Sequence, residues 1–124
     1  VFKEKSMDIN HLPWVVWLDW IYELSKHKYG IQLGTASAGT FNLNCSYLGI
    51  PCIGYNNVDT QIKCHPELSV DVGDIGKAKS LIKKLKNDKE FYSECSEKTK
   101  KLHKQLYSED VYVKKIKNIF KNKL

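Results

Sequence analysis

The stretch from Tyr29 to Tyr55 constrains the fold of this chain more than any other. Two short apolar segments, Gly30 to Leu33 and Pro51 to Tyr55, have the length and composition of buried strands. Between them lie a loop of small residues, Gly34 to Gly39, and a segment from Thr40 to Leu48 that suits a short helix. This order predicts two parallel strands, with a ligand-binding crevice outside the carboxyl end of the first strand.

The start of this helix has the features of an anion site. Small side chains in the loop let a ligand approach the backbone, and we expect the N–H groups of Gly39, Thr40 and Phe41 to be free. Thr35 and Ser37 add hydroxyl donors, as Thr40 also does. The alternative is that the loop is only a tight connection between a strand and a helix.

Several other classes of site are disfavoured by their missing motifs. The loop has neither the Gly-Lys-Ser/Thr ending of a P-loop nor the Gly-x-Gly-x-x-Gly pattern of nicotinamide enzymes. With no Asp-x-Asp and no second pair beside Cys64 and His65, we expect no protein-bound metal. His65, just before Pro66, is expected to be a loop residue. Without a Cys-x-x-Cys motif the cysteines are expected to be free, buried thiols: Cys45, Cys52, Cys64 and Cys95.

The flanking segments complete an α/β pattern. Pro13 opens a helical stripe that carries Trp14, Trp17 and Trp20. The polar segment from Asn56 to Pro66 is expected to be a loop at the same edge of the sheet as the first loop, and Leu68 to Val72 to be a third strand.

Three helices are expected to close the domain. Asp74 and Asp88 are suited to cap the first two helices, and Ser108 begins the third. The third helix is expected to bury Tyr112, Ile116, Ile119 and Phe120 and to fray after Phe120. The expected class is therefore α/β, with a Rossmann-like small parallel sheet flanked by helices and closed by C-terminal helices.

Charge is distributed unevenly along the chain. The 20 basic residues are all lysines, and 15 of them lie in residues 77–124. Since specific nucleic-acid recognition favours the planar fork of arginine, no specific nucleic-acid partner is expected. Two explanations remain for the lysine-rich segment: a helical face exposed to solvent, or attraction to an anionic membrane surface.

The segment from Ala38 to Gly54, followed by Asn57-Val-Asp-Thr-Gln61, resembles the donor half of GT-B glycosyltransferases. The resemblance rests on the small-residue loop, the helix and the turn Gly49-Ile-Pro51. It implies that residues 1–124 form one C-terminal domain of a two-domain enzyme. The paired glutamates of retaining members are absent, because Asn44 replaces the second and Ala36 falls near the first.

The resemblance also implies a set of donor-binding residues. The loop would hold a diphosphate, and Asn44 would lie at the ribose. Asp59 and Gln61 would either touch sugar hydroxyls or only cap a turn. No catalytic residue is identified. The implied donor-binding residues are Thr35, Ser37, Ala38, Gly39, Thr40, Asn44, Asp59 and Gln61.

By this resemblance the chain binds a nucleotide-diphosphate sugar as a substrate, without a cofactor, in a cytoplasmic glycosyltransferase that builds a glycan or polysaccharide. Its partners would be a missing N-terminal acceptor domain and, through the lysine-rich helices, the inner face of a membrane. A non-hydrolysing sugar-nucleotide epimerase shares the fold. The alternative from another class is a non-catalytic basic module that binds nucleic acid or an anionic membrane. We also expect an exposed apolar patch on the tryptophan helix, on the last helix or on both, which would favour self-association.

Overall fold

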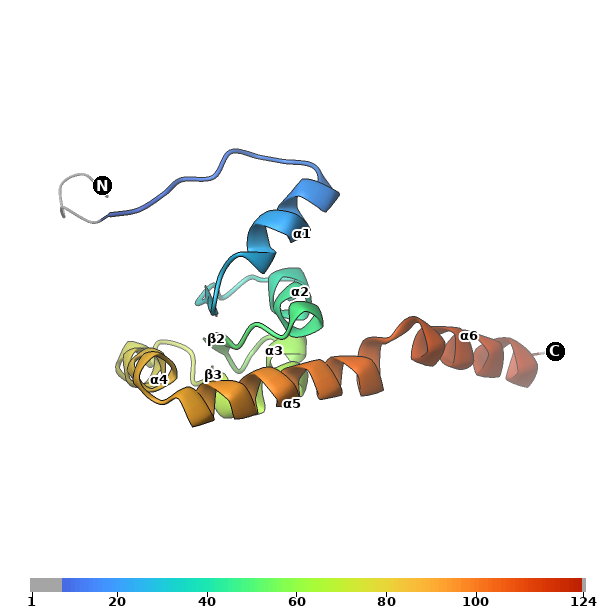
Figure 1. Cartoon of the computed structure of the whole chain (residues 1–124). Coiled ribbons are helices and arrows are strands. Elements are labelled where there is room, and N and C mark those ends of the chain that lie inside the picture. The colour runs from blue at the N-terminus through green and yellow to red at the C-terminus, as the bar shows by residue number, and fades with distance from the viewer. Residues whose placement is uncertain (1–7, 124) are drawn as a thin grey trace.

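A three-stranded parallel sheet lies at the centre of the protein, whose computed structural model describes residues 8–123. The strands, in their order across the sheet, are β1 (Gly30–Gln32), β2 (Cys52–Tyr55) and β3 (Ser69–Val70). Around the sheet lie α1 (Trp17–Ser25), α2 (Thr40–Leu48), α3 (Asp59–Cys64), the 3-10 turn η2 (Pro66–Leu68), α4 (Ile75–Asn87) and α5 (Lys89–Tyr107), and α6 (Glu109–Lys123) follows (Figure 1). Of the described residues 64% are helical, and together with the three-stranded parallel sheet this confirms the predicted α/β class with a small parallel sheet.

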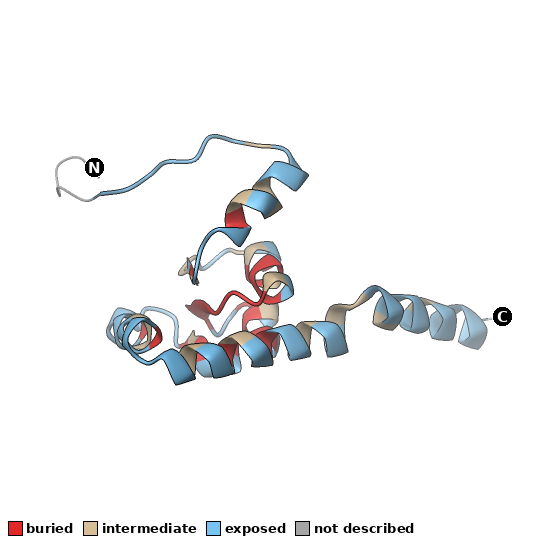
Figure 2. Ribbon diagram, in the orientation of Figure 1, coloured by how far each residue is buried: buried red, intermediate tan, exposed pale blue. Residues whose placement is uncertain are grey.

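The central strand β2 divides the core into two hydrophobic clusters. All four of its residues are buried (Figure 2), and successive side chains of a strand point to opposite faces of its sheet. Ile53 and Tyr55 belong to the cluster formed with α4 and α5, whereas Cys52 belongs to the cluster formed with α1 and α2. Helices therefore cover the sheet on both faces, and its carboxyl edge is left to the connecting loops.

The boundaries of four helices follow the capping signals of the sequence. Asp74 accepts a hydrogen bond from the N–H of Lys77 at 3.0 Å, and Asp88 accepts one from Phe91 at 3.0 Å. Gly49 ends α2 with a left-handed φ of 71°. Ser108 precedes α6. These starts and stops confirm the predictions.

Three elements differ from the sequence predictions. The first helix begins at Trp17 rather than Pro13, because Val16 is extended and β-branched residues favour that conformation. The segment expected to be a loop contains α3, in which Asp59 and Lys63 form an ion pair of 2.9 Å one turn apart. The third strand is shorter than expected, because η2 ends at Leu68 and Val72 already lies in the turn before α4.

The expected buried face of the last helix was wrong. Helix α6 has no buried residue and extends away from the sheet beyond the end of α5 (Figures 1 and 2). Among the described residues no element covers most of its apolar side chains, and Phe120 is 61% exposed. The helix also continues to Lys123 rather than fraying after Phe120.

The tryptophan-bearing segment is also exposed. Trp14 is 88% exposed and lies before α1, and Trp17 is 57% exposed. Trp20 alone of the three packs inward, with its ring 6.2 Å from that of Phe41. Within residues 8–123, no helix is both long and apolar enough to cross a membrane.

Candidate functional site

The loops that follow β1 and β2 meet at the carboxyl edge of the sheet. The side-chain amide of Asn57 donates a hydrogen bond to the Thr35 carbonyl at 3.1 Å. The Thr60 hydroxyl donates one to the Gly39 carbonyl at 2.8 Å. Since parallel strands end at one edge, ligands of such sheets bind there. The prediction that the two loops share an edge is confirmed.

Helix α2 begins at this edge without a side-chain cap. No side chain in the described part of the chain accepts a hydrogen bond from its first turn, and that turn contains no acidic residue. Its exposed first residue is Thr40. The N–H of Gly39 was expected to be free, but it donates a hydrogen bond to Ser37 Oγ at 3.1 Å. The unpaired donors of a first turn, together with the helix dipole, favour an anion at this position.

Gly39 is required by the close approach of the loop to α3. Its φ is 81°, in the left-handed region. A Cβ here would lie 2.3 Å from Thr60 Oγ1 and 3.1 Å from a methyl carbon of Val58. A valine here would therefore disturb the fold as well as block a ligand, because its side chain would collide with the protein itself.

We therefore expect Gly39→Ala to lower the free energy of unfolding by about 2–3 kcal/mol, from backbone strain together with the collision. The matched control is Gly73→Ala, because Gly73 has a φ of 88° but nothing within 4 Å of its Cβ position. Strain alone should cost the control about 1 kcal/mol. Urea unfolding of both variants measures the difference, and equal losses would show that the contact with Thr60 is unimportant.

Asn44 lies one helical turn beyond Thr40 and lines a groove between α1, α2 and α5. The residue is 7% exposed, and its side-chain amide has no hydrogen-bond partner among the described residues but still reaches solvent. The groove has a volume of about 430 Å³. Its other lining residues are Trp17, Leu18, Ile21, Leu43, Tyr47 and His103. The amide of Asn44 therefore faces an apolar, partly aromatic groove that is open to solvent.

The remaining predicted site residues fall into two groups. Thr35, Ala38 and Thr40 are exposed around the start of α2. Asp59 is exposed at the start of α3, next to Thr60. Gln61 is fully buried, and its amide nitrogen donates to the carbonyls of Cys52 at 2.9 Å and Leu68 at 3.2 Å. The structure thus brings the loop residues together and places Gln61 in the core, away from any sugar.

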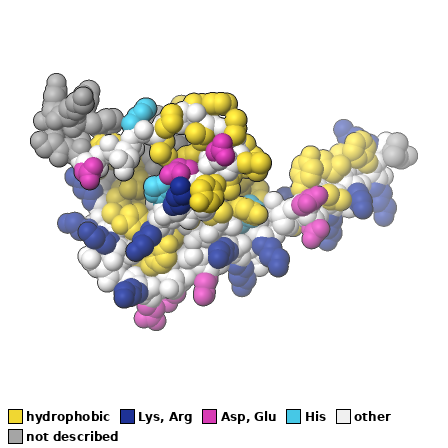
Figure 3. All heavy atoms as spheres, turned by 45° about the horizontal axis from the view of Figure 1, so that its top comes forward, with side chains coloured by type: hydrophobic (Ala, Val, Ile, Leu, Met, Phe, Trp, Pro, Cys, Tyr) yellow, Lys and Arg dark blue, Asp and Glu magenta, His cyan; other side chains and the backbone are white. Residues whose placement is uncertain are grey.

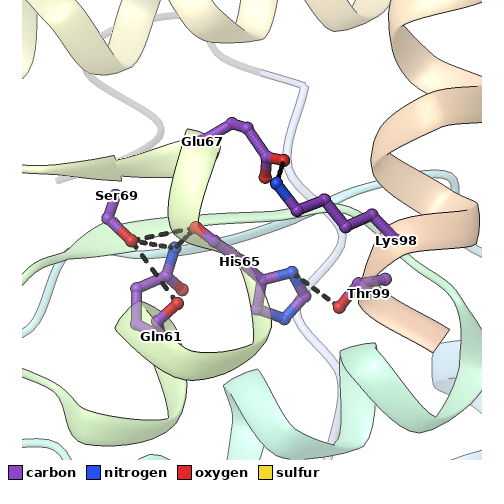
Figure 4. A network of polar contacts seen from close by, with 6 residues as sticks. All are labelled: Gln61, His65, Glu67, Ser69, Lys98 and Thr99. Carbon is purple, nitrogen blue, oxygen red and sulfur yellow. Dashed lines mark hydrogen bonds and ion pairs between the residues drawn. The ribbon is translucent and has the colours of Figure 1, made fainter. Parts of the chain in front are cut away.

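Gln61 belongs to a buried polar network that links α3 to β2 and β3. Its oxygen accepts a hydrogen bond of 2.7 Å from the Asn42 amide. Beside it, the Ser69 hydroxyl donates to the His65 carbonyl at 2.9 Å (Figure 4). An ion pair between Glu67 and Lys98 ties the same region to α5. We interpret the network as structural, because most of its polar atoms bond one another or the backbone; Asn42 Oδ1 is buried without a partner among the described residues.

His65 is a core residue rather than the loop residue expected. The N–H of Cys52 donates to its Nδ1 at 3.3 Å, and a backbone N–H can only donate, so Nδ1 carries no proton. The Thr99 hydroxyl also donates to Nδ1, at 3.1 Å, and Nε2 donates to the Asn42 carbonyl at 2.9 Å. Burial lowers the pKa of His65 to about 4, although the bond to Asn42 opposes the shift. This imidazole is neutral and enclosed, which does not suit a general base.

The cysteines are free and buried, as predicted. Burial raises the pKa of Cys64, and it raises the pKa of Cys95 to about 11. Contact with the Cys45 thiol, followed by burial, raises the pKa of Cys52. These three thiols stay protonated and are poor nucleophiles. Among residues 8–123 no group of three His, Cys, Asp or Glu side chains could hold a metal ion.

Comparisons with protein-family models, with curated protein sequences and with solved structures found no match. The geometry of the chain itself must therefore carry any assignment. It offers two adjoining features: an uncapped helix start at the carboxyl edge of the sheet, and a side-chain amide without a protein partner among the described residues, in a groove one turn along the same helix. Two contributors to this groove, Trp17 and Tyr47, were missed from the sequence. Exposure of apolar residues on the tryptophan helix was predicted, but the pattern alone could not show that Trp17 and Tyr47 line one groove with Asn44.

Proposed function

We propose that this chain is the nucleotide-sugar-binding domain of a glycosyltransferase with a Rossmann-like, GT-B type of fold. The carrying observation is the unpaired amide of Asn44, which is 7% exposed in a groove that lies one turn from the uncapped start of α2. A diphosphate at the start of α2 would accept hydrogen bonds from first-turn N–H groups and from Thr40. A ribose at Asn44 would then supply the partner that the amide lacks.

The groove also suits a nucleobase. Trp17 and Tyr47 both line it, and both are exposed, at 57% and 64%. Aromatic rings offer a stacking surface to a planar base, worth about 1–3 kcal/mol for each base stacked. In such an enzyme a second domain would bring the acceptor and the catalytic group, so this chain alone would bind a donor without turning it over. A second domain would also cover exposed apolar residues of α1.

The test is a titration of the chain with UDP and with GDP, followed through backbone amide chemical shifts. We expect perturbations confined to residues 34–44 and to the residues of the groove. An absence of shifts there at millimolar nucleotide would contradict the proposal. Shifts that instead appear among the lysines of α5 would indicate only nonspecific attraction of an anion.

The variant Asn44→Ala tests the contribution of the ribose separately from that of the diphosphate. It should weaken UDP binding about threefold to tenfold, the value of one hydrogen bond, and leave pyrophosphate binding unchanged. The matched control is Asn118→Ala, because Asn118 is exposed on α6 and far along the chain from the groove. An equal effect of both variants on UDP would remove Asn44 from the site.

A further inference from the structure

Helix α6 presents an apolar face that no described part of the chain covers. The helix has 15 residues, none of which is buried. Tyr112, Ile119 and Phe120 are 66%, 53% and 61% exposed. Isolated helices of this length are only marginally stable in water. A helix of this kind is therefore stabilised when its apolar face packs against another surface.

The side chains of α6 are sorted around its axis. At about 100° per residue, five apolar residues fall within about 120° of the circumference. They are Tyr112, Val113, Ile116, Ile119 and Phe120. Val111 lies outside this arc, and the charged residues Glu109 and Lys123 fall within it at the two ends of the helix. Lys115 and Lys117 flank this arc, and Lys114 and Lys121 lie farther round. Figure 3 shows the apolar side chains of this helix gathered mainly along one side and lysines mainly along the other.

We propose that α6 docks on the surface of an anionic phospholipid bilayer, lying in the plane of the interface. At about 1.5 Å per residue the helix is about 22 Å long, shorter than the hydrocarbon core. Its apolar arc would enter the boundary between headgroups and acyl chains. The flanking lysines would lay their aliphatic stems along that boundary and place their ammonium groups among lipid phosphates.

The distribution of charge on α6 favours an anionic bilayer over a second copy of the chain as the binding partner. The acids of α6, Glu109 and Asp110, are confined to its first turn, and its last turn carries Lys121 and Lys123. Helix α5 continues the basic surface with exposed lysines at Lys100, Lys101 and Lys104. Two copies facing each other through α6 would bring these lysines together, whereas an anionic lipid surface attracts all of them.

The apolar contribution is tested by flotation of the 124-residue chain with vesicles. The vesicles contain equal parts of phosphatidylglycerol and phosphatidylcholine, or phosphatidylcholine alone. We expect binding to the anionic vesicles, release by salt, and little binding to the neutral vesicles. Ile119→Asn combined with Phe120→Asn keeps the charge and should weaken binding about tenfold or more. Unchanged binding would overturn the proposal.

The charge contribution is tested with two variants that each remove three lysines. Replacing Lys115, Lys117 and Lys123 by Gln should weaken binding about fivefold for each lysine removed, because these three lie on or beside the apolar arc. Replacing Lys77, Lys79 and Lys83 of α4, all of them exposed, should change it less than twofold. Equal losses in the two variants would mean that net charge alone attracts the chain, and would overturn the assignment to α6.

Folding and self-association are measured on the same variants. Because α6 buries nothing, each variant should keep the thermal unfolding midpoint of the parent within a few degrees. Sedimentation of the parent should show a monomer in the absence of lipid. A dimer that Ile119→Asn with Phe120→Asn converts to a monomer, with no vesicle binding by the parent, would assign this face to a second copy instead.

Discussion

Replacing Gln61 with alanine is expected to lower the free energy of unfolding by about 3–5 kcal/mol. The side chain is fully buried, and its amide group bonds three partners, the carbonyls of Cys52 and Leu68 and the amide of Asn42. Truncation would leave these three polar groups buried without their partner and would open a cavity. Loss of this magnitude approaches the whole stability of a small domain.

The matched control is Gln105→Ala, because Gln105 is an exposed glutamine on α5. It should change stability by less than about 0.5 kcal/mol. Urea unfolding with far-UV circular dichroism measures both variants. If Gln61→Ala fails to fold, Asn42→Ala offers a second measurement. Asn42 Nδ2 donates to Gln61, but Asn42 Oδ1 has no partner among the described residues, so this substitution removes fewer hydrogen bonds. A loss below about 1 kcal/mol in both would contradict the structural role of the network.

The second large effect expected is a loss of stability in mild acid, caused by His65. Its folded pKa is about 4, against an ordinary value of 6.5. The unfolded chain therefore binds this proton more tightly than the folded protein does, and stability falls as the pH falls from about 6.5 to about 4. At 1.36 kcal/mol per pKa unit the total loss is about 3 kcal/mol. Burial also lowers the pKa of His103, which acts in the same direction.

The dependence is measured as the free energy of unfolding at several pH values. His103→Gln should keep most of the slope, because His103 is only partly buried. His65→Gln should remove most of it, at a large cost in stability. Direct NMR titration of the imidazole in the parent chain avoids that cost. A His65 that takes up a proton near pH 6.5 while the protein stays folded would contradict the enclosed, neutral state.

Local signals in the sequence predicted the framework of the fold well. The pattern from Gly30 to Tyr55 predicted two parallel strands and the limits of α2. The end of α2 was predicted because Gly49, as a glycine, readily adopts the left-handed conformation that terminates a helix. Asp74 and Asp88 marked the starts of α4 and α5, since their carboxylates accept hydrogen bonds from the first turn of each helix. Such caps act within a few residues and need no distant partner.

The loop at the carboxyl edge could also be predicted from the sequence. The small residues before Thr40 identified a helix start open to a ligand, and parallel pairing places the ends of neighbouring strands together. The sequence did not predict that Gly39 is held against Thr60, a contact between loops 21 residues apart. Nor did it show that the face of α2 bearing Asn44 opens into a groove with Trp17 of α1.

Tertiary structure alone decided which polar and apolar side chains are buried. Gln61 and His65 read as loop residues, but packing of α3 against β2 encloses both and lowers the pKa of the imidazole. The apolar stripe of α6 has the same periodicity as that of a packed helix, yet no described element covers it. Periodicity determines which residues share a face, because it depends only on helical geometry. Whether that face meets the core, a ligand or solvent depends on elements distant in sequence.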